Sequence, residues 1–182
     1  PAMSRALFEG IAICLKAFFG LQYCIDHTEG CNELLIALGR GVDGRLILDK
    51  GQFLSSSCTR QPARLKDLFR AGCKIRTHSP HAGGFSCMHA KSWVLDSSVL
   101  FIGSVNFTHN SLDKSKENMM RTTEPSAVAD AIADYEQLWR DSTPVTYEIL
   151  EAMLEAQCAA KERKSEKQAE DRAARARSRA SA

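Results

Sequence analysis

Six positions between residues 89 and 106 carry side chains or backbone that could do chemistry together. They are His89, Lys91, Asp96, Gly103, Ser104 and Asn106, in the pattern HxKxxxxDxxxxxxGSxN. An ammonium can supply charge to a phosphoryl oxygen, and a hydroxyl and an amide can supply neutral donors of fixed geometry. This set of groups therefore predicts a site that binds and cleaves a phosphodiester.

His89 is the candidate nucleophile, because an imidazole can form a covalent phosphohistidine. Lys91, Ser104 and Asn106 are the candidate phosphate-binding residues. This chemistry requires no cofactor, and the segment offers no carboxylate cluster for a metal ion. A second imidazole is needed to protonate the leaving oxygen and then to activate water. The histidines outside the motif are His27, His78, His81 and His109, and none of them lies in an HxK sequence.

A hairpin must bring these side chains together. Two β-rich runs, 89–95 and 99–102, flank the turn-forming residues 96–98. Residues two apart on a strand point to the same face. We therefore expect His89 and Lys91 to project together, and the residues after the second strand to lie beside them.

The rest of the chain alternates between helical and strand patterns. Helices are expected over residues 4–17, around 34–38, from 62 and from 125, and strands over 21–25, 46–48, 74–77 and 117–122. This alternation predicts an α/β layered domain with a mixed or parallel sheet flanked by helices. Residues 161–182 carry a net charge of +4 on a chain of net charge +2, so we expect a basic tail, either helical or disordered.

The cysteines predict a reducing, intracellular environment. Their number is odd, no CxxC pair occurs, and most lie in apolar runs, so we expect reduced and mainly buried thiols. They are Cys14, Cys24, Cys31, Cys58, Cys73, Cys87 and Cys158. A zinc site built from His78, His81, Cys87 and His89 fits no closed tetrahedral spacing well, so no metal site is predicted.

The segment resembles the HKD motif of the phospholipase D superfamily. The likeness continues through Gly103–Thr108 and Glu117–Asn118, which is similar to the single-motif branch that includes bacterial endonucleases and mitochondrial cardiolipin hydrolases. The resemblance implies a phospholipase D-like catalytic domain over residues 1–142, whose usual first strand is missing here, followed by a C-terminal helix and basic tail over 143–182. It also implies a mitochondrial outer-membrane location.

The resemblance further assigns roles to residues. His89 would be the nucleophile, and Glu117, the family's downstream acidic residue, would orient an imidazole through its second nitrogen. Asp96 completes the motif but lies at the turn, so we expect it to support the hairpin. Gly103 would allow a close backbone approach. A single motif implies a homodimer with one active site shared across the two-fold axis.

Three functions remain open from the sequence. The first is a phospholipase acting on cardiolipin or another phospholipid, and the second is a nuclease for single-stranded RNA or DNA. A nuclease groove needs basic and stacking side chains, and the candidates are Phe85, Trp93, Phe107, Lys114, Lys116 and Arg121. The third is a non-catalytic module whose basic tail contacts acidic membranes or RNA.

Overall fold

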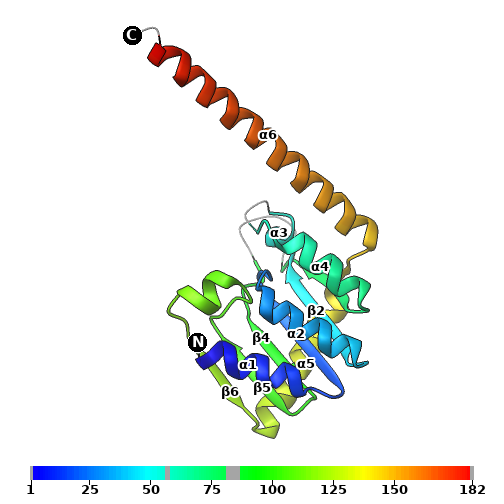
Figure 1. Cartoon of the computed structure of the whole chain (residues 1–182). Helices are drawn as coiled ribbons and strands as arrows, with labels where there is room; N and C mark the ends of the chain where they lie inside the picture. Colours follow the sequence, from blue (N-terminus) through cyan, green and yellow to red (C-terminus); the bar gives the residue numbers. More distant parts are fainter. Residues whose placement is uncertain (1, 56–57, 81–86, 181–182) are drawn as a thin grey trace.

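The computed structural model describes residues 2–55, 58–80 and 87–180 (Figure 1). Its elements are α1 (Ala2–Ile13), β1 (Ala17–Gln22), α2 (Thr28–Gly39), β2 (Asp43–Asp49), α3 (Lys50–Phe53), α4 (Gln61–Arg70), β3 (Lys74–His78), β4 (Ser92–Leu95), β5 (Val99–Gly103), the π-helical turn η1 (Asn110–Lys114), β6 (Met119–Thr122), α5 (Pro125–Asp141), β7 (Thr143–Pro144) and α6 (Tyr147–Ala180). The predicted α/β class is confirmed.

Seven strands form one mixed sheet in the order β6-β5-β4-β1-β2-β3-β7. β1, β2 and β3 are parallel neighbours, whereas β4 is antiparallel to β1 and to β5, and β6 is antiparallel to β5. The carboxyl ends of β1, β2 and β5 therefore share one edge of the sheet with the starts of β4 and β6. This edge carries the candidate site. β7 pairs with β3, so the boundary predicted after residue 142 falls just before a strand of the same sheet.

The first helix and strand are placed differently from the prediction. The helix expected over 4–17 ends at Ile13, and the strand expected over 21–25 lies at 17–22. The cause is remote in sequence: the carboxylate of Asp96 accepts the backbone N–H groups of Leu15, Lys16 and Ala17. These bonds draw the chain out of the helix and start β1 early.

The hairpin of β4 and β5 is confirmed, but its first strand is shorter than predicted. Asp96 and Ser97 at the turn have φ of 51° and 54°, the left-handed conformation that both central residues of a type I′ turn require. β4 begins only at Ser92, because its neighbour β1 ends its ladder at the Leu21–Ser92 pair. Residues 89–91 are therefore not strand residues. His89 is exposed and Lys91 is buried, and both side chains lie beside the ring of Tyr23.

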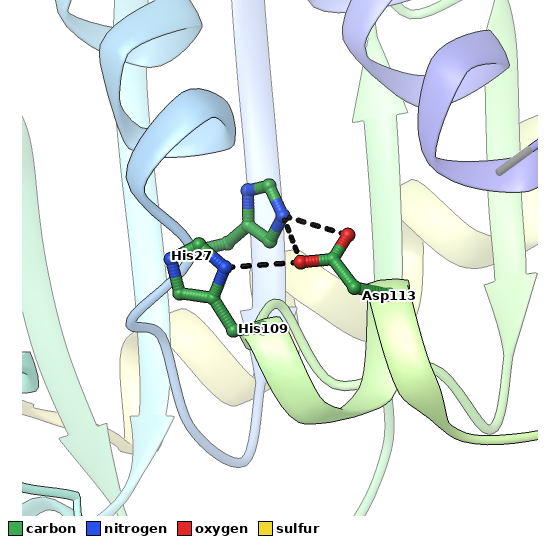
Figure 2. Close-up of side chains that lie close together, drawn as sticks. All are labelled: His27, His109 and Asp113. Atoms are coloured by element: carbon green, nitrogen blue, oxygen red, sulfur yellow. Dashed lines mark hydrogen bonds and ion pairs between the residues drawn. The ribbon is translucent and has the colours of Figure 1, made fainter.

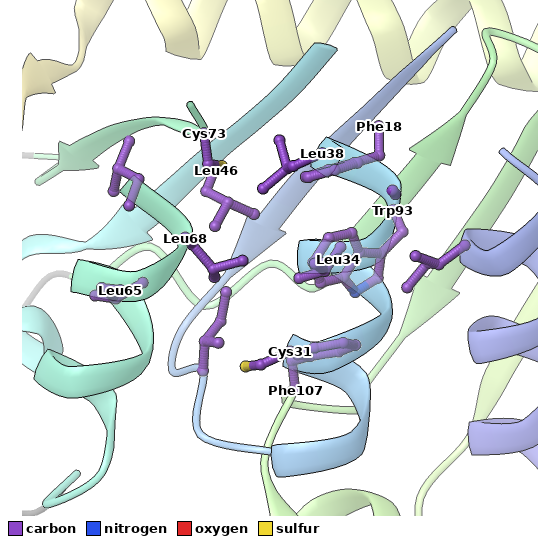
Figure 3. Packing of buried hydrophobic residues seen from close by; sticks show 14 of the residues in the cluster. Phe18, Cys31, Leu34, Leu38, Leu46, Leu65, Leu68, Cys73, Trp93 and Phe107 are labelled. Carbon is purple, nitrogen blue, oxygen red and sulfur yellow. The ribbon is translucent and has the colours of Figure 1, made fainter. Parts of the chain in front are cut away.

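Helices cover both faces of the sheet. Helices α1, α2 and α4, with the first turns of α6, enclose the larger core, whose buried side chains surround Leu34 and Trp93 (Figure 3). Helix α5 covers the other face through Val128 and Tyr135. Gly103 has no room for a side chain, because a Cβ there would lie 2.1 Å from the carbonyl oxygen of Asn118. The predicted close backbone approach is thus confirmed.

The expectation that all cysteines are reduced is wrong for one pair. Cys24 and Cys58 form a disulfide, because the loops after β1 and after α3 meet at the same edge of the sheet. Cys14, Cys31 and Cys73 are buried free thiols, as predicted, while the free thiols of Cys87 and Cys158 are exposed.

The C-terminal segment is helical, which is one of the two predicted alternatives. Helix α6 packs on α4 through the fully buried Leu150 and through an ion pair between Lys66 and Glu151, and it then extends away from the domain (Figure 1). Among the helices in the described part of the chain, none has the length and apolar content needed to span a bilayer.

Candidate active site

Lys91 is the buried cation of the site. Only 4% of the residue is exposed, and its Nζ donates a hydrogen bond to the backbone oxygen of His89. The ammonium also lies 5.4 Å from the centre of the Tyr23 ring. Burial lowers the pKa of Lys91, an effect that the nearby Cys87 and Glu117 oppose. A desolvated ammonium of this kind gains more from an anionic ligand than an exposed one would.

His89 lies at the outer end of the same segment. Its ring meets the Tyr23 ring edge to face, with 5.0 Å between centroids, and the residue is exposed. The backbone behind it is fixed, because the N–H of Met88 donates to the buried carboxylate of Asp49 at 2.8 Å. The imidazole is therefore presented to solvent from an anchored backbone.

Ser104, Asn106 and Glu117 are joined by a chain of hydrogen bonds through Ser111. The hydroxyls of Ser104 and Ser111 donate to the two oxygens of Glu117, at 2.5 and 2.6 Å. Ser111 Oγ in turn accepts the backbone N–H of Asn106 at 3.0 Å. The bonds from Ser104 and Ser111 lower the pKa of Glu117, so it is a carboxylate at neutral pH. Each oxygen of Glu117 thus accepts one hydroxyl within the chain, and its expected role as a partner of an imidazole stays a prediction.

Backbone pairing brings the two halves of the motif together. The N–H of Gly103 donates to the carbonyl of Lys91 at 3.2 Å, so Lys91 lies across the hairpin from the residue before Ser104. The side-chain oxygen of Asn106 is buried and has no hydrogen-bond partner among the described residues. A buried amide oxygen without a partner costs free energy. The amide oxygen of Asn106 is therefore an unused hydrogen-bond acceptor.

Asp96 is separated from this cluster by the length of the hairpin. Besides the backbone bonds that start β1, it accepts the thiol of Cys14. Partial burial works to raise the pKa of Asp96, but the bonds from Leu15, Cys14, Lys16 and Ala17 outweigh it and lower the pKa. The carboxylate holds the turn and the start of β1 in place.

The sequence analysis did not single out Tyr23, Asp49 or Ser111. Asp49 ends a strand that is buried on both faces, at the edge where the carboxyl ends of parallel strands meet, and that position is a usable signal. Tyr23 directly follows β1 at the same edge. Ser111 had no comparable signal, because only the fold brings it to Glu117.

One further cluster joins the loop after β1 to η1 (Figure 2). The carboxylate of Asp113 lies 3.2 Å from Nε2 of His27 and 3.0 Å from Nδ1 of His109. The bonds from His109 and His27 lower the pKa of Asp113. These three residues are the one set of potential metal ligands that lie close together within the described ranges. The zinc set considered above includes His81, which lies outside the described residues, as does Phe85.

Hydrogen bonds on the far side of each ring argue against a metal ion in this cluster. Nδ1 of His27 accepts the N–H of Gly30, and Nε2 of His109 accepts the N–H of Thr28. A neutral ring that accepts at one nitrogen carries its proton on the other. The nitrogens that face Asp113 are therefore N–H donors, which leaves them no lone pair for a metal.

Comparisons with known proteins agree with the motif. The model of the cardiolipin synthase phospholipase D-like domain matches residues 7–139. Mitochondrial cardiolipin hydrolase of Xenopus tropicalis is 28% identical over 152 residues, covering 81% of this chain and 68% of that protein. The Xenopus laevis protein of the same name is 32% identical over 149 residues, covering 80% and 65%. The chain thus spans about two thirds of the length of these relatives.

Solved structures show the same fold. Nuc from Salmonella typhimurium, a phospholipase D family member, superposes with a TM-score of 0.69 at 20% identity, over 78% of this chain and 90% of that one. NucT from Helicobacter pylori gives 0.70 at 15% identity, over 79% and 91%. The relatives support the predicted classification as a phosphoric diester hydrolase. The chain belongs to the phospholipase D-like family.

Proposed function

We propose that this chain hydrolyses a phosphodiester through a phosphohistidine, without a metal ion, and that its substrate is a phospholipid such as cardiolipin, from which it releases phosphatidic acid. The observation that carries the proposal is the buried Lys91 ammonium, whose backbone pairs across the hairpin with Gly103, the residue before the Ser104–Glu117–Ser111 network. The names of the curated relatives support the lipid substrate.

In the proposed first step a ring nitrogen of His89 attacks phosphorus. A nitrogen–phosphorus bond forms while the bond to the leaving oxygen breaks, and a second imidazolium gives that oxygen a proton. Lys91, Ser104 and Asn106 stabilise the charge on the phosphoryl oxygens. In the second step water attacks phosphorus, the second imidazole takes its proton, and His89 is released.

The second imidazole is proposed to be His89 of a second copy of the chain. His27 and His109 have both ring nitrogens engaged, so neither is free to exchange a proton with substrate. An apolar pair beside the site supports self-association: Ile102 and Met120 are cross-strand partners that are 42% and 61% exposed. A homodimer would bring two copies of His89 to one phosphate.

A nuclease that uses the same site is the alternative, and the structural neighbours named Nuc and NucT give it a basis. Trp93 and Phe107, two of the candidate stacking residues, are each 1% exposed and belong to the core. They are not available to stack on bases. Lys114, Lys116 and Arg121 are exposed, and it is the names of the curated relatives that favour the lipid.

The remaining proposals concern location. The curated relatives are named as mitochondrial, which supports a mitochondrial location for this chain. The charged part of α6 is proposed to contact acidic membrane lipids through its Lys and Arg residues. In the third function considered from the sequence, a non-catalytic module, the same tail would bind acidic membranes or RNA.

One experiment tests the proposed activity. Purified chain and its His89→Ala variant are offered vesicles containing cardiolipin and, in parallel, labelled single-stranded RNA, with and without a chelator. We expect the wild type to release phosphatidic acid in the presence of the chelator, and His89→Ala to release none. Cleavage of RNA alone would favour the nuclease, and equal activity of the two proteins would refute the role of His89.

A further inference from the structure

The His27–Asp113–His109 cluster joins a buried imidazole to a more exposed carboxylate. His27 is 2% exposed, whereas the side chain of Asp113 is 44% exposed. Figure 2 shows both rings turned toward the one carboxylate, His27 from the loop before α2 and His109 from the residue before η1. The carboxylate is thus a bridge between two segments that are more than 80 residues apart.

The bridge has a defined proton arrangement. Both imidazoles are neutral when each accepts a backbone N–H on its far side, and each then donates to Asp113. Thr28 extends the network, since its hydroxyl lies 3.0 Å from Nε2 of His109 and accepts a bond from Arg64 at 3.0 Å. A carboxylate, which only accepts, matches two donors.

The turn that Asp113 belongs to also carries Ser111. Ser111 holds the backbone N–H of Asn106 and one oxygen of Glu117, as described above. A second set of bonds ties the same stretch to the loop after β1: the N–H groups of Asp26 and His27 donate to the carbonyl of Phe107. Asp113 therefore anchors the turn whose Ser111 contacts two candidate site residues. π-helical turns are frequent at functional sites.

We propose that Asp113 is a positioning residue for the phosphate-binding segment 104–117, acting through His27, His109 and Ser111. The proposal rests on the proposed function, because it assumes that Asn106 and Glu117 serve phosphate binding. Its bridge fixes η1 against the loop after β1, and η1 in turn fixes the backbone of Asn106. A misplacement of about 1 Å at such a site can cost about 100-fold in rate.

The test compares two variants of Asp113 with a matched control. Asp113→Ala removes the acceptor of both imidazoles, and we expect kcat/KM on cardiolipin vesicles to fall by about 10- to 100-fold. Asp113→Asn keeps one oxygen, which can take the place of the Oδ2 that both rings contact, and we expect it to retain activity within about 5-fold of the wild type. Glu151→Ala is the control, because its side chain is also 44% exposed and its ion pair to Lys66 lies away from the site.

Hydrogen exchange gives a readout that is independent of turnover. In Asp113→Ala the amide of Asn106 should exchange faster by about 10-fold or more, while amides of β1 and β2 keep their rates, and Glu151→Ala should leave Asn106 unchanged. A wild type without activity would refute the proposed function, and exchange would still test the bridge. An active wild type with Asp113→Ala within twofold of it, or unchanged exchange at Asn106, would overturn the inference.

Discussion

Replacing Lys91 by methionine should separate catalysis from stability. Lys91 is 4% exposed, and its ammonium has one hydrogen bond to a carbonyl and a ring contact to Tyr23 in place of a paired carboxylate. Methionine fills nearly the same space without a charge to desolvate. Loss of one preorganised donor costs about 100- to 1,000-fold in kcat, so activity should fall by at least about 100-fold. Removal of a poorly compensated buried charge should raise the free energy of unfolding by about 1 kcal/mol.

That gain corresponds to a melting temperature higher by about 2–4 °C in a domain of this size. Its dependence on pH has a definite sign. Burial lowers the pKa of Lys91 in the folded chain below its ordinary value of 10.5, so between the two values the unfolded chain binds more protons. The unfolding free energy of the wild type therefore rises with pH in that range. The advantage of Lys91→Met should be complete at neutral pH and shrink as the pH approaches 10.5.

Thermal unfolding at several pH values and turnover of cardiolipin vesicles measure both effects. Lys66→Met is the matched control, because the side chain of Lys66 is 14% exposed but ion-paired to Glu151 at 2.6 Å. It should lose stability, since Glu151 is left unpaired, and keep its activity. A Lys91→Met protein that melts well below the wild type, or that retains most of its activity, would show that this reasoning about Lys91 is wrong.

Two further predictions concern residues that stabilise the fold around the site. Asp96→Ala should lower the unfolding free energy by about 2 kcal/mol while folded protein keeps its activity, because the carboxylate caps three N–H groups away from the site. The lowered pKa of Asp96 means that its contribution is present above pH 3.8 and is lost as the pH falls, so denaturation curves of variant and wild type should converge in acid. Cys58→Ser should destabilise the chain by about 3–4 kcal/mol in denaturant unfolding, since the Cys24 bridge closes a loop of 34 residues, and no difference under oxidising conditions would contradict it.

The sequence was most informative where local chemistry decides the structure. The turn at Asp96 and Ser97, the close approach at Gly103 and the buried strand around Ile47 all follow from residue types and short spacings. The end of α1 did not follow, because Asp96 acts on it from some 80 residues away. The Cys24–Cys58 disulfide did not follow from the sequence either, because only the order of the strands in the sheet brings its two loops together.

In the candidate site, too, local patterns could be predicted and contacts between remote segments could not. Spacing placed Lys91 near Ser104, but the strand predicted over residues 89–95 begins only at Ser92, where the ladder with β1 ends. The partner of Glu117 could not be predicted from spacing either. Ser111 lies within η1, and no local pattern indicates that such a turn folds back onto a carboxylate six residues later.

The candidate phosphate-binding groups of this site lie within one chain, whereas the proposed mechanism takes its two imidazoles from two chains. The Lys91 ammonium, the Ser104 hydroxyl and the Glu117 carboxylate are each fixed by bonds within the chain. His27 and His109 are also fixed, but each donates its ring N–H to the Asp113 carboxylate, so that proton is not free to be exchanged with a substrate. His89 is the exposed histidine among the described residues, while His78, at the carboxyl end of β3, is partly buried and its Nδ1 has no hydrogen-bond partner there. We propose that the second imidazole is His89 of a second copy of the chain, and the exposed side chains of Ile102 and Met120 on β5 and β6 give that copy a surface to contact.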